Sequence, residues 1–105
     1  MPELEKYTNA IKQMCIAHNV KRLYAFGSVL TDKYAANSDI DFIVDFQPIE
    51  INQYADNYYD FKFSLENILH RPVDLLEWKA INNPYFLQVI NNKKTRWSEF
   101  FYYSN

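Results

Sequence analysis

Two aspartates separated by one residue, Asp39 and Asp41, are the first candidates for chemistry in this chain. They open the segment DIDFIVDF, whose alternation is typical of a β-strand, so both side chains project to the same side. Like charges that close raise each other's proton affinity unless a cation lies between them, and carboxylate oxygens suit Mg²⁺. Asp45 continues the same face about 13 Å further along, too far to share the site. The pair predicts a metal site, although a solvent-facing edge strand carries the same pattern.

The only glycine of the chain, Gly27, directly precedes Ser28 at the end of a hydrophobic segment. A glycine where a strand ends permits backbone angles barred to other residues and lets a ligand approach closely. If a helical turn begins there, its amide groups and the Ser28 hydroxyl form a seat for phosphate. An ordinary β-turn would also use a glycine. Together with the aspartates, the pattern predicts a phosphate cradle beside a carboxylate pair.

Helices and strands must hold these residues in place. Apolar side chains at helical or alternating spacing predict two helices, 3–18 (ended by Asn19) and 52–69, and three strands, 20–26, 39–46 and 71–78. The segment 29–38 is expected to be a turn or a short helical piece. This order indicates an α/β or α+β fold with the helices packed on a small sheet.

The C-terminal quarter of the chain is less regular. Asn83-Pro84 is typical of a helix start and predicts a short helix that ends near Asn91. The following KKTRWSEFFYYSN has no clear period. Its basic residues Lys93, Lys94 and Arg96 are expected to be solvated, with contact to phosphate or to a partner as the alternative. WSEFFYY is too apolar for a bare tail, so it either packs back onto the sheet or covers a partner surface.

Several residues that could bind a metal, act as a nucleophile or stack on bases have structural explanations instead. His18 closes the apolar stripe of the first helix, and His70 has no metal-ligand spacing with it. Cys15 lies on the same stripe, where a small buried hydrophobe is the usual role. The aromatic series on the second helix, Tyr54, Tyr58 and Phe61, is at helical spacing and is expected to be core rather than a base-stacking surface.

Length and composition restrict the class of protein. The 105 residues suit one domain over 1–105, and with 49% hydrophobic residues the chain can bury a core. One cysteine fits a reducing compartment, and neither a membrane span nor a secretory signal is recognisable, so a cytoplasmic protein is expected. The net charge of −2 disfavours nucleic acid as a direct ligand.

The spacing Gly27-Ser28, then ten residues, then Asp39-Ile40-Asp41 resembles the GS-x10-D-x-D pattern of the DNA polymerase β-like nucleotidyltransferases. The segment FGSVLTDKYAANSDIDFIVDF is similar to the minimal, MNT-type members of that superfamily, as is the later HRPVDLLE. The resemblance covers most of the chain. It implies a nucleotidyltransferase fold, a small mixed β-sheet with helices packed on it.

This resemblance implies transfer of AMP from ATP to a hydroxyl group, with two Mg²⁺ ions as cofactors. Asp39 and Asp41 would bind both metal ions. Asp74 would be the third metal-binding carboxylate, on the side of the acceptor hydroxyl. It lies between apolar residues of the third predicted strand and points away from them, whereas Glu77 faces the other way and is the weaker candidate.

The same resemblance implies that Gly27, Ser28 and Lys33 hold the phosphates of ATP. Many relatives carry a GS-x-R-x-x-R pattern, but this chain has Leu30 at the first basic position and Lys33 at the second. Lysine is a point charge that cannot form the bidentate fork of arginine. The substitution at Leu30 therefore leaves triphosphate affinity as an open question.

Two functions follow from these observations. MNT-type relatives are typically encoded beside a small helical HEPN-type ribonuclease toxin, act as its antitoxin and attach AMP to a toxin tyrosine. The complete set of three aspartates favours such an adenylyltransferase in a type VII-like toxin–antitoxin pair. Leu30 favours the alternative, a weak or inactive MNT-fold protein that neutralises or scaffolds a partner by binding alone. Antibiotic modification is disfavoured because no second domain is recognisable to bind a drug.

Overall fold

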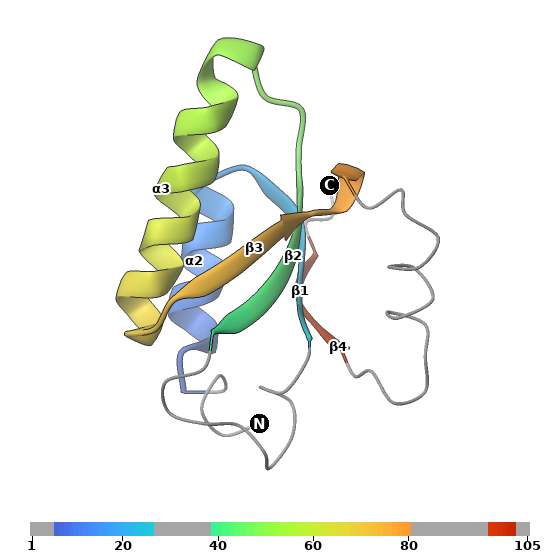
Figure 1. Ribbon diagram of the computed structural model, residues 1–105. Coiled ribbons are helices and arrows are strands. Elements are labelled where there is room, and N and C mark those ends of the chain that lie inside the picture. Colours follow the sequence, from blue (N-terminus) through green and yellow to red (C-terminus); the bar gives the residue numbers. More distant parts are fainter. Residues whose placement is uncertain (1–5, 27–38, 81–96, 103–105) are drawn as a thin grey trace.

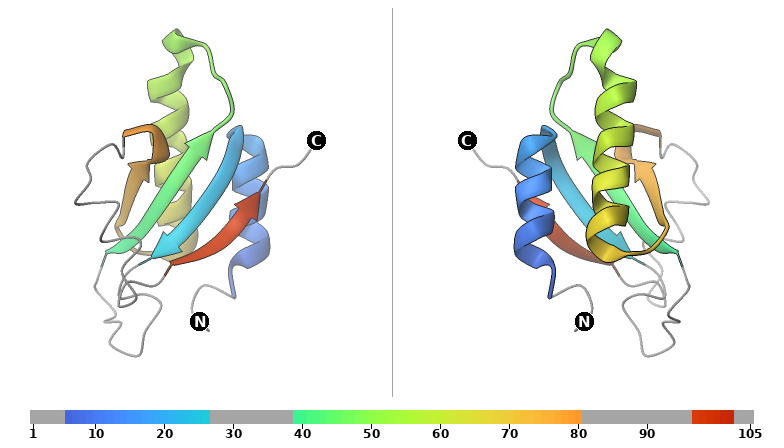
Figure 2. Two further views of the ribbon diagram at one scale, coloured as in Figure 1. Left: turned by 90° about the vertical axis from the view of Figure 1, so that its right-hand side faces the viewer. Right: turned by 90° about the vertical axis from the view of Figure 1, so that its left-hand side faces the viewer.

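The computed structural model describes residues 6–26, 39–80 and 97–102. In chain order, its elements are α2 (Thr8–Ala17), β1 (Val20–Phe26), β2 (Ile40–Phe46), α3 (Ile51–Leu69), β3 (Val73–Glu77), the 3₁₀ turn η2 (Trp78–Ala80) and β4 (Trp97–Tyr102). The described strands form one mixed sheet in the order β3-β2-β1-β4. Helices α2 and α3 lie side by side on one face of that sheet (Figures 1 and 2). The prediction of a small mixed sheet with packed helices is confirmed.

Helix α2 ends at Ala17, one residue before the predicted end at residue 18. The ring of His18 donates from Nδ1 to the carbonyl oxygen of Met14 at 2.8 Å, and Asn19 follows with φ of 59°. Asparagine adopts this left-handed conformation more readily than most residues, so it can turn the chain from the helix into β1. The helix begins at Thr8 after a turn at Lys6 and Tyr7, and the predicted start at residue 3 lies outside the described residues.

Strands β1 and β2 form the antiparallel centre of the sheet. The bounds of β1 are those predicted, and β2 begins one residue after the predicted start at residue 39. On β2 the alternate side chains belong to the core beneath the helices, namely Ile40, Phe42, Val44 and Phe46. Strict alternation of apolar residues toward one face is what fixes the pairing register of a strand.

Helix α3 is the crossover that lets β2 and β3 run parallel, because parallel neighbours cannot be joined by a tight turn. It ends at Leu69, and His70 takes a left-handed conformation with φ of 56°. The carboxylate of Glu66 accepts a hydrogen bond from the Val73 amide at 2.8 Å, which links the end of α3 to the start of β3.

The core lies between the sheet and the two helices. Phe61 and Leu65 of α3 are fully buried there, and Tyr54 and Tyr58 pack against it. The ring of Phe46 meets the rings of Tyr54 and Phe61 edge-on at 5.7 and 5.9 Å. The aromatic series is therefore core, as predicted. Within the described ranges, no helix has the length and apolar character needed to cross a membrane.

Strand β4 was not assigned from the sequence. It pairs antiparallel with β1, so the first of the two expectations for WSEFFYY, packing back onto the sheet, is confirmed. The pairing register shifts between Leu23 and Tyr24, and such an irregularity removes the period of two by which strands are recognised. The predicted turn at 29–38 and the predicted helix from Asn83 to Asn91 lie outside the described residues.

Candidate active site

The pairing of β2 with β3 brings two of the three candidate carboxylates together. Asp41 and Asp74 are register partners on these parallel strands, whose backbones lie about 4.8 Å apart. Their sequence neighbours Ile40, Phe42, Val73 and Leu75 belong to the core beneath the helices. Because side chains alternate along a strand, Asp41 and Asp74 project from the opposite face. Asp74 is exposed and Asp41 is half-buried.

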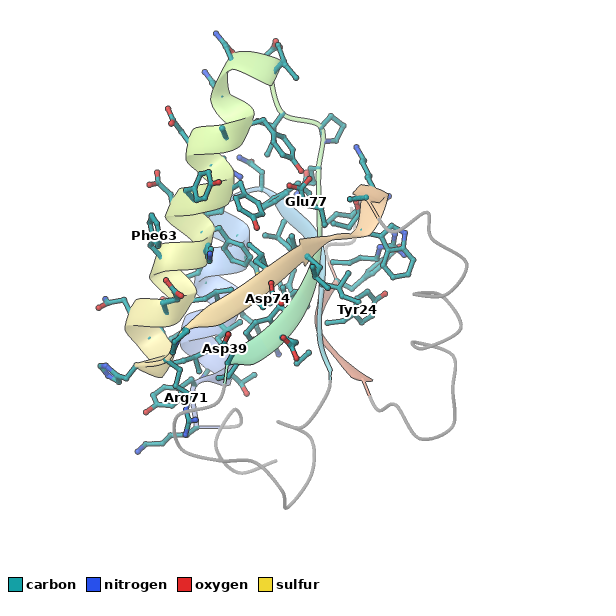
Figure 3. All side chains as sticks on the ribbon, viewed as in Figure 1. Tyr24, Asp39, Phe63, Arg71, Asp74 and Glu77 are labelled. Carbon is teal, nitrogen blue, oxygen red and sulfur yellow. The ribbon has the colours of Figure 1, made fainter. Side chains whose placement is uncertain are left out.

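Asp39 directly precedes β2 and is exposed, and Figure 3 shows it beside the start of that strand. Burial raises the pKa of the Asp41 carboxyl, and the negative charges of Asp74 and Asp39 raise it further. The three carboxylates therefore repel one another, and a bound cation would relieve this repulsion. Within the described ranges, no three His, Cys, Asp or Glu side chains are already gathered as metal ligands.

The end of β1 adjoins the same position of the sheet. Phe26, its last residue, is the register partner of Asp41 on the other side of β2. Gly27 and Ser28 are the next residues of the chain, so the last described residue before them lies beside this carboxylate. Gly27, Ser28, Leu30 and Lys33 themselves lie outside the described residues.

The remaining carboxylates of β2 and β3 form hydrogen bonds away from the candidate site. Glu77 points to the helix side of the sheet and accepts a hydrogen bond from the Tyr54 hydroxyl at 2.5 Å. Asp45 accepts two hydrogen bonds from Arg22, from Nε at 3.1 Å and from Nη2 at 2.8 Å. The expectation that Asp45 lies apart from the site and that Glu77 faces away agrees with these contacts.

An aromatic cluster continues the face on which Asp41 lies. Buried Tyr24 and Ile43 pack there with Leu76 and Trp78. The guanidinium of Arg22 lies 4.6 Å from the centre of the Trp78 ring, within the range of a cation–π contact. Neither Arg22 nor Trp78 was expected from the sequence to have a role at the site. The one sequence feature that could have identified Arg22 is the alternation along β1, because it places Arg22 on the same face as Tyr24.

The other discounted residues are structural, as expected. The ring of His18 packs against Phe61 at 5.6 Å. Cys15 is fully buried, and that burial raises the pKa of its thiol to about 12, so it is inert as a nucleophile. His70 is the left-handed residue after α3. The basic residues Lys93, Lys94 and Arg96 lie outside the described part of the chain.

Comparison with known proteins agrees with this geometry. The family model described as Polymerase beta, Nucleotidyltransferase matches residues 9–98. The "Putative protein adenylyltransferase MJ1379" of Methanocaldococcus jannaschii is 33% identical over 82 residues, which cover 78% of each protein. Both matches include the two strands that carry the aspartates.

Two solved structures have the same fold. A "putative minimal nucleotidyltransferase" superposes with a TM-score of 0.69 at 25% identity, over 84% of this chain and 87% of that one. The complex of tri-AMPylated Shewanella oneidensis HEPN toxin with MNT antitoxin matches with a TM-score of 0.63 at 19% identity, over 94% of this chain and 72% of the matched chain.

Proposed function

The chain belongs to the polymerase beta nucleotidyltransferase family, and from that premise we propose that it transfers AMP from ATP to a protein hydroxyl group. One observation carries the proposal. The parallel pairing of β2 with β3 sets Asp41 beside Asp74, at the point where β1 ends and the Gly27-Ser28 segment begins. Transfer of a nucleotidyl group requires a carboxylate pair next to a phosphate-binding segment, and we assign that second role to Gly27 and Ser28.

The carboxylates fit a divalent cation. Asp39, Asp41 and Asp74 would hold two Mg²⁺ ions, whose charge would offset the repulsion that raises the pKa of Asp41. When bound, these ions would supply positive charge that offsets the charge on the α-phosphate and lowers the pKa of the acceptor hydroxyl. The aspartates stand on or directly beside paired strands, so the chain has little reorganisation to make before the reaction.

The reaction is a displacement at the α-phosphorus of ATP. The acceptor oxygen forms a bond to that phosphorus, the bond to the bridging oxygen of the β-phosphate breaks, and pyrophosphate leaves with the bonding electrons. A carboxylate oxygen of Asp74 accepts the hydroxyl proton, since this residue is exposed and can therefore be reached by a second substrate. Gly27, Ser28 and Lys33 hold the β- and γ-phosphates.

We propose a HEPN-type toxin as the acceptor protein, with the chain acting as its antitoxin. The name of the Methanocaldococcus relative, a protein adenylyltransferase, and the AMP-modified toxin in the Shewanella complex support this assignment. The modified residue would be a tyrosine, whose phenolic oxygen can attack the α-phosphorus once it is deprotonated. The alternative, neutralisation of the partner by binding alone, is favoured by Leu30.

Transfer of labelled AMP separates the two functions. The purified chain is incubated with α-labelled ATP, Mg²⁺ and the co-expressed toxin, and label on the toxin is quantified with and without EDTA. Asp41→Asn and Asp74→Asn should abolish labelling. Glu50→Gln, an exposed carboxylate beyond the far end of β2, is the matched control and should label at the wild-type rate. Complex formation without any labelling would contradict transfer and support the binding function.

A further inference from the structure

The outer surface of α3 carries an apolar ridge made of Ile51, Ala55, Tyr59 and Phe63, all of which are exposed. Ile51, Tyr59 and Phe63 leave 91%, 51% and 56% of their surface to solvent. These residues are four apart, so they form one of the side-chain rows that interdigitate when two helices pack. The ridge runs for about 18 Å. Figure 3 shows Phe63 pointing away from the sheet.

The aromatic part of the ridge is held in place from below. The ring of Tyr59 lies 6.0 Å from that of Phe63 and meets the ring of Tyr58 edge-on at 5.0 Å. Tyr58 in turn donates its hydroxyl to the carbonyl oxygen of Leu75 on β3 at 2.6 Å. Side chains that are already fixed before binding lose little conformational entropy in a complex. Tyrosines that become buried in an interface are frequent anchors of binding.

Charge along the ridge indicates what it can bind. Asp56 and Asp60, both exposed, follow Ala55 and Tyr59 by one residue and therefore line one flank of the ridge. The cation of this helix, Lys62, is half-buried and falls on the other flank by helical spacing. If two copies of the chain paired antiparallel through the ridge, the aspartates of both would face one another on the same side. Such like-charge contacts oppose antiparallel pairing of two copies, and the exposed aspartates favour a partner with basic residues along the facing flank.

We propose that the ridge docks a helix of a partner protein with apolar side chains at three- and four-residue spacing and Lys or Arg along one flank. The contact would be a packing of two helices in which side-chain ridges interdigitate, with Tyr59 and Phe63 as anchors. The helices cover the face of the sheet opposite to Asp41 and Asp74. A helix bound to α3 therefore leaves the carboxylate face open, and docking is separate from transfer.

The test uses a synthetic amphipathic helix of about 18 residues, long enough to span the ridge. One version carries a leucine stripe with Lys along one flank, and the second carries Glu at the Lys positions. Binding to the ¹⁵N-labelled chain is followed by amide chemical shifts. We expect shifts at residues 51–63 and at least about tenfold tighter binding of the Lys helix. Phe63→Ser should weaken binding by at least about tenfold, since truncating an anchor has that effect.

Tyr102→Ser is the matched control, because Tyr102 is exposed to 54% but stands on β4, away from α3. It should bind the Lys helix like the wild type. Equal binding of the Lys and Glu helices, shifts confined to other elements, or no shift at the ridge would overturn the proposal. So would a dimer of the chain alone that Phe63→Ser dissociates. The measurement contains no ATP, so its outcome is independent of whether the chain transfers AMP.

Discussion

Replacing Asp45 by asparagine should destabilise the protein while leaving transfer intact, although Asp45 shares a strand face with Asp41. Asp45 is nearly buried and accepts two hydrogen bonds from Arg22, whose guanidinium also rests on the Trp78 ring. Asparagine keeps one acceptor oxygen but loses the charge, so Arg22 stays on this face without a counter-ion. The cost therefore falls on folding rather than on catalysis.

The size of the effect follows from burial. Breaking a fully buried ion pair costs about 3–5 kcal/mol. Here the side chains of Arg22 and Asp45 are 24% and 9% exposed, so Arg22 can partly rehydrate. Both hydrogen bonds from Arg22 end on the same carboxylate oxygen, so the amide oxygen of asparagine can still accept from Arg22. These two discounts leave a loss of about 2 kcal/mol. For a domain of this size that loss lowers the melting temperature by about 8–16 °C.

Urea denaturation followed by circular dichroism measures the free energy of unfolding of the wild type, Asp45→Asn and the exposed control Glu50→Gln. AMP transfer is then measured well below the lowest melting temperature. We expect a lower unfolding midpoint with an unchanged slope for Asp45→Asn, and near-wild-type transfer. An Asp45→Asn protein as stable as the wild type but inactive would refute the structural assignment and place Asp45 in the site.

Three further outcomes are expected. Because burial and the neighbouring carboxylates raise the pKa of Asp41, the folded chain binds this proton more tightly than the unfolded chain, and metal-free stability falls as the pH rises through that pKa. Asp41→Asn should therefore unfold at higher urea than the wild type at pH 7 in EDTA, and this advantage should shrink toward pH 4; a constant difference would contradict the coupling. Tyr54→Phe removes the hydrogen bond to Glu77 and should lower the free energy of unfolding by about 1–2 kcal/mol, measured by urea titration. Glu77→Gln keeps an acceptor and should lower it less; equal losses would count against the assigned contact. Cys15 should react with a thiol reagent at pH 8 only as fast as the chain unfolds, because its thiol is fully buried with a pKa of about 12. Rapid labelling in native buffer would contradict this expectation, because it would show that the core around Cys15 opens without global unfolding.

The sequence by itself determined the local structure and the direction of most side chains. Alternation along residues 39–46 put Asp41 on the face opposite the apolar residues of the strand, and the same rule separated Asp74 from Glu77. Helical spacing identified Phe61 as core, and Asn19 marked the end of the first helix. These features depend on neighbours a few residues apart, which a single sequence displays directly.

Only the tertiary structure decided which strands are neighbours. That Asp41 stands beside Asp74 depends on the parallel crossover through α3, and that Arg22 holds Asp45 depends on the register of β1 with β2. Strand β4 was missed because its pairing is irregular and its partner lies more than 70 residues earlier in the chain. The local alternation of side chains determines which face of a strand is buried, but it does not specify which distant segment becomes the neighbour of that strand.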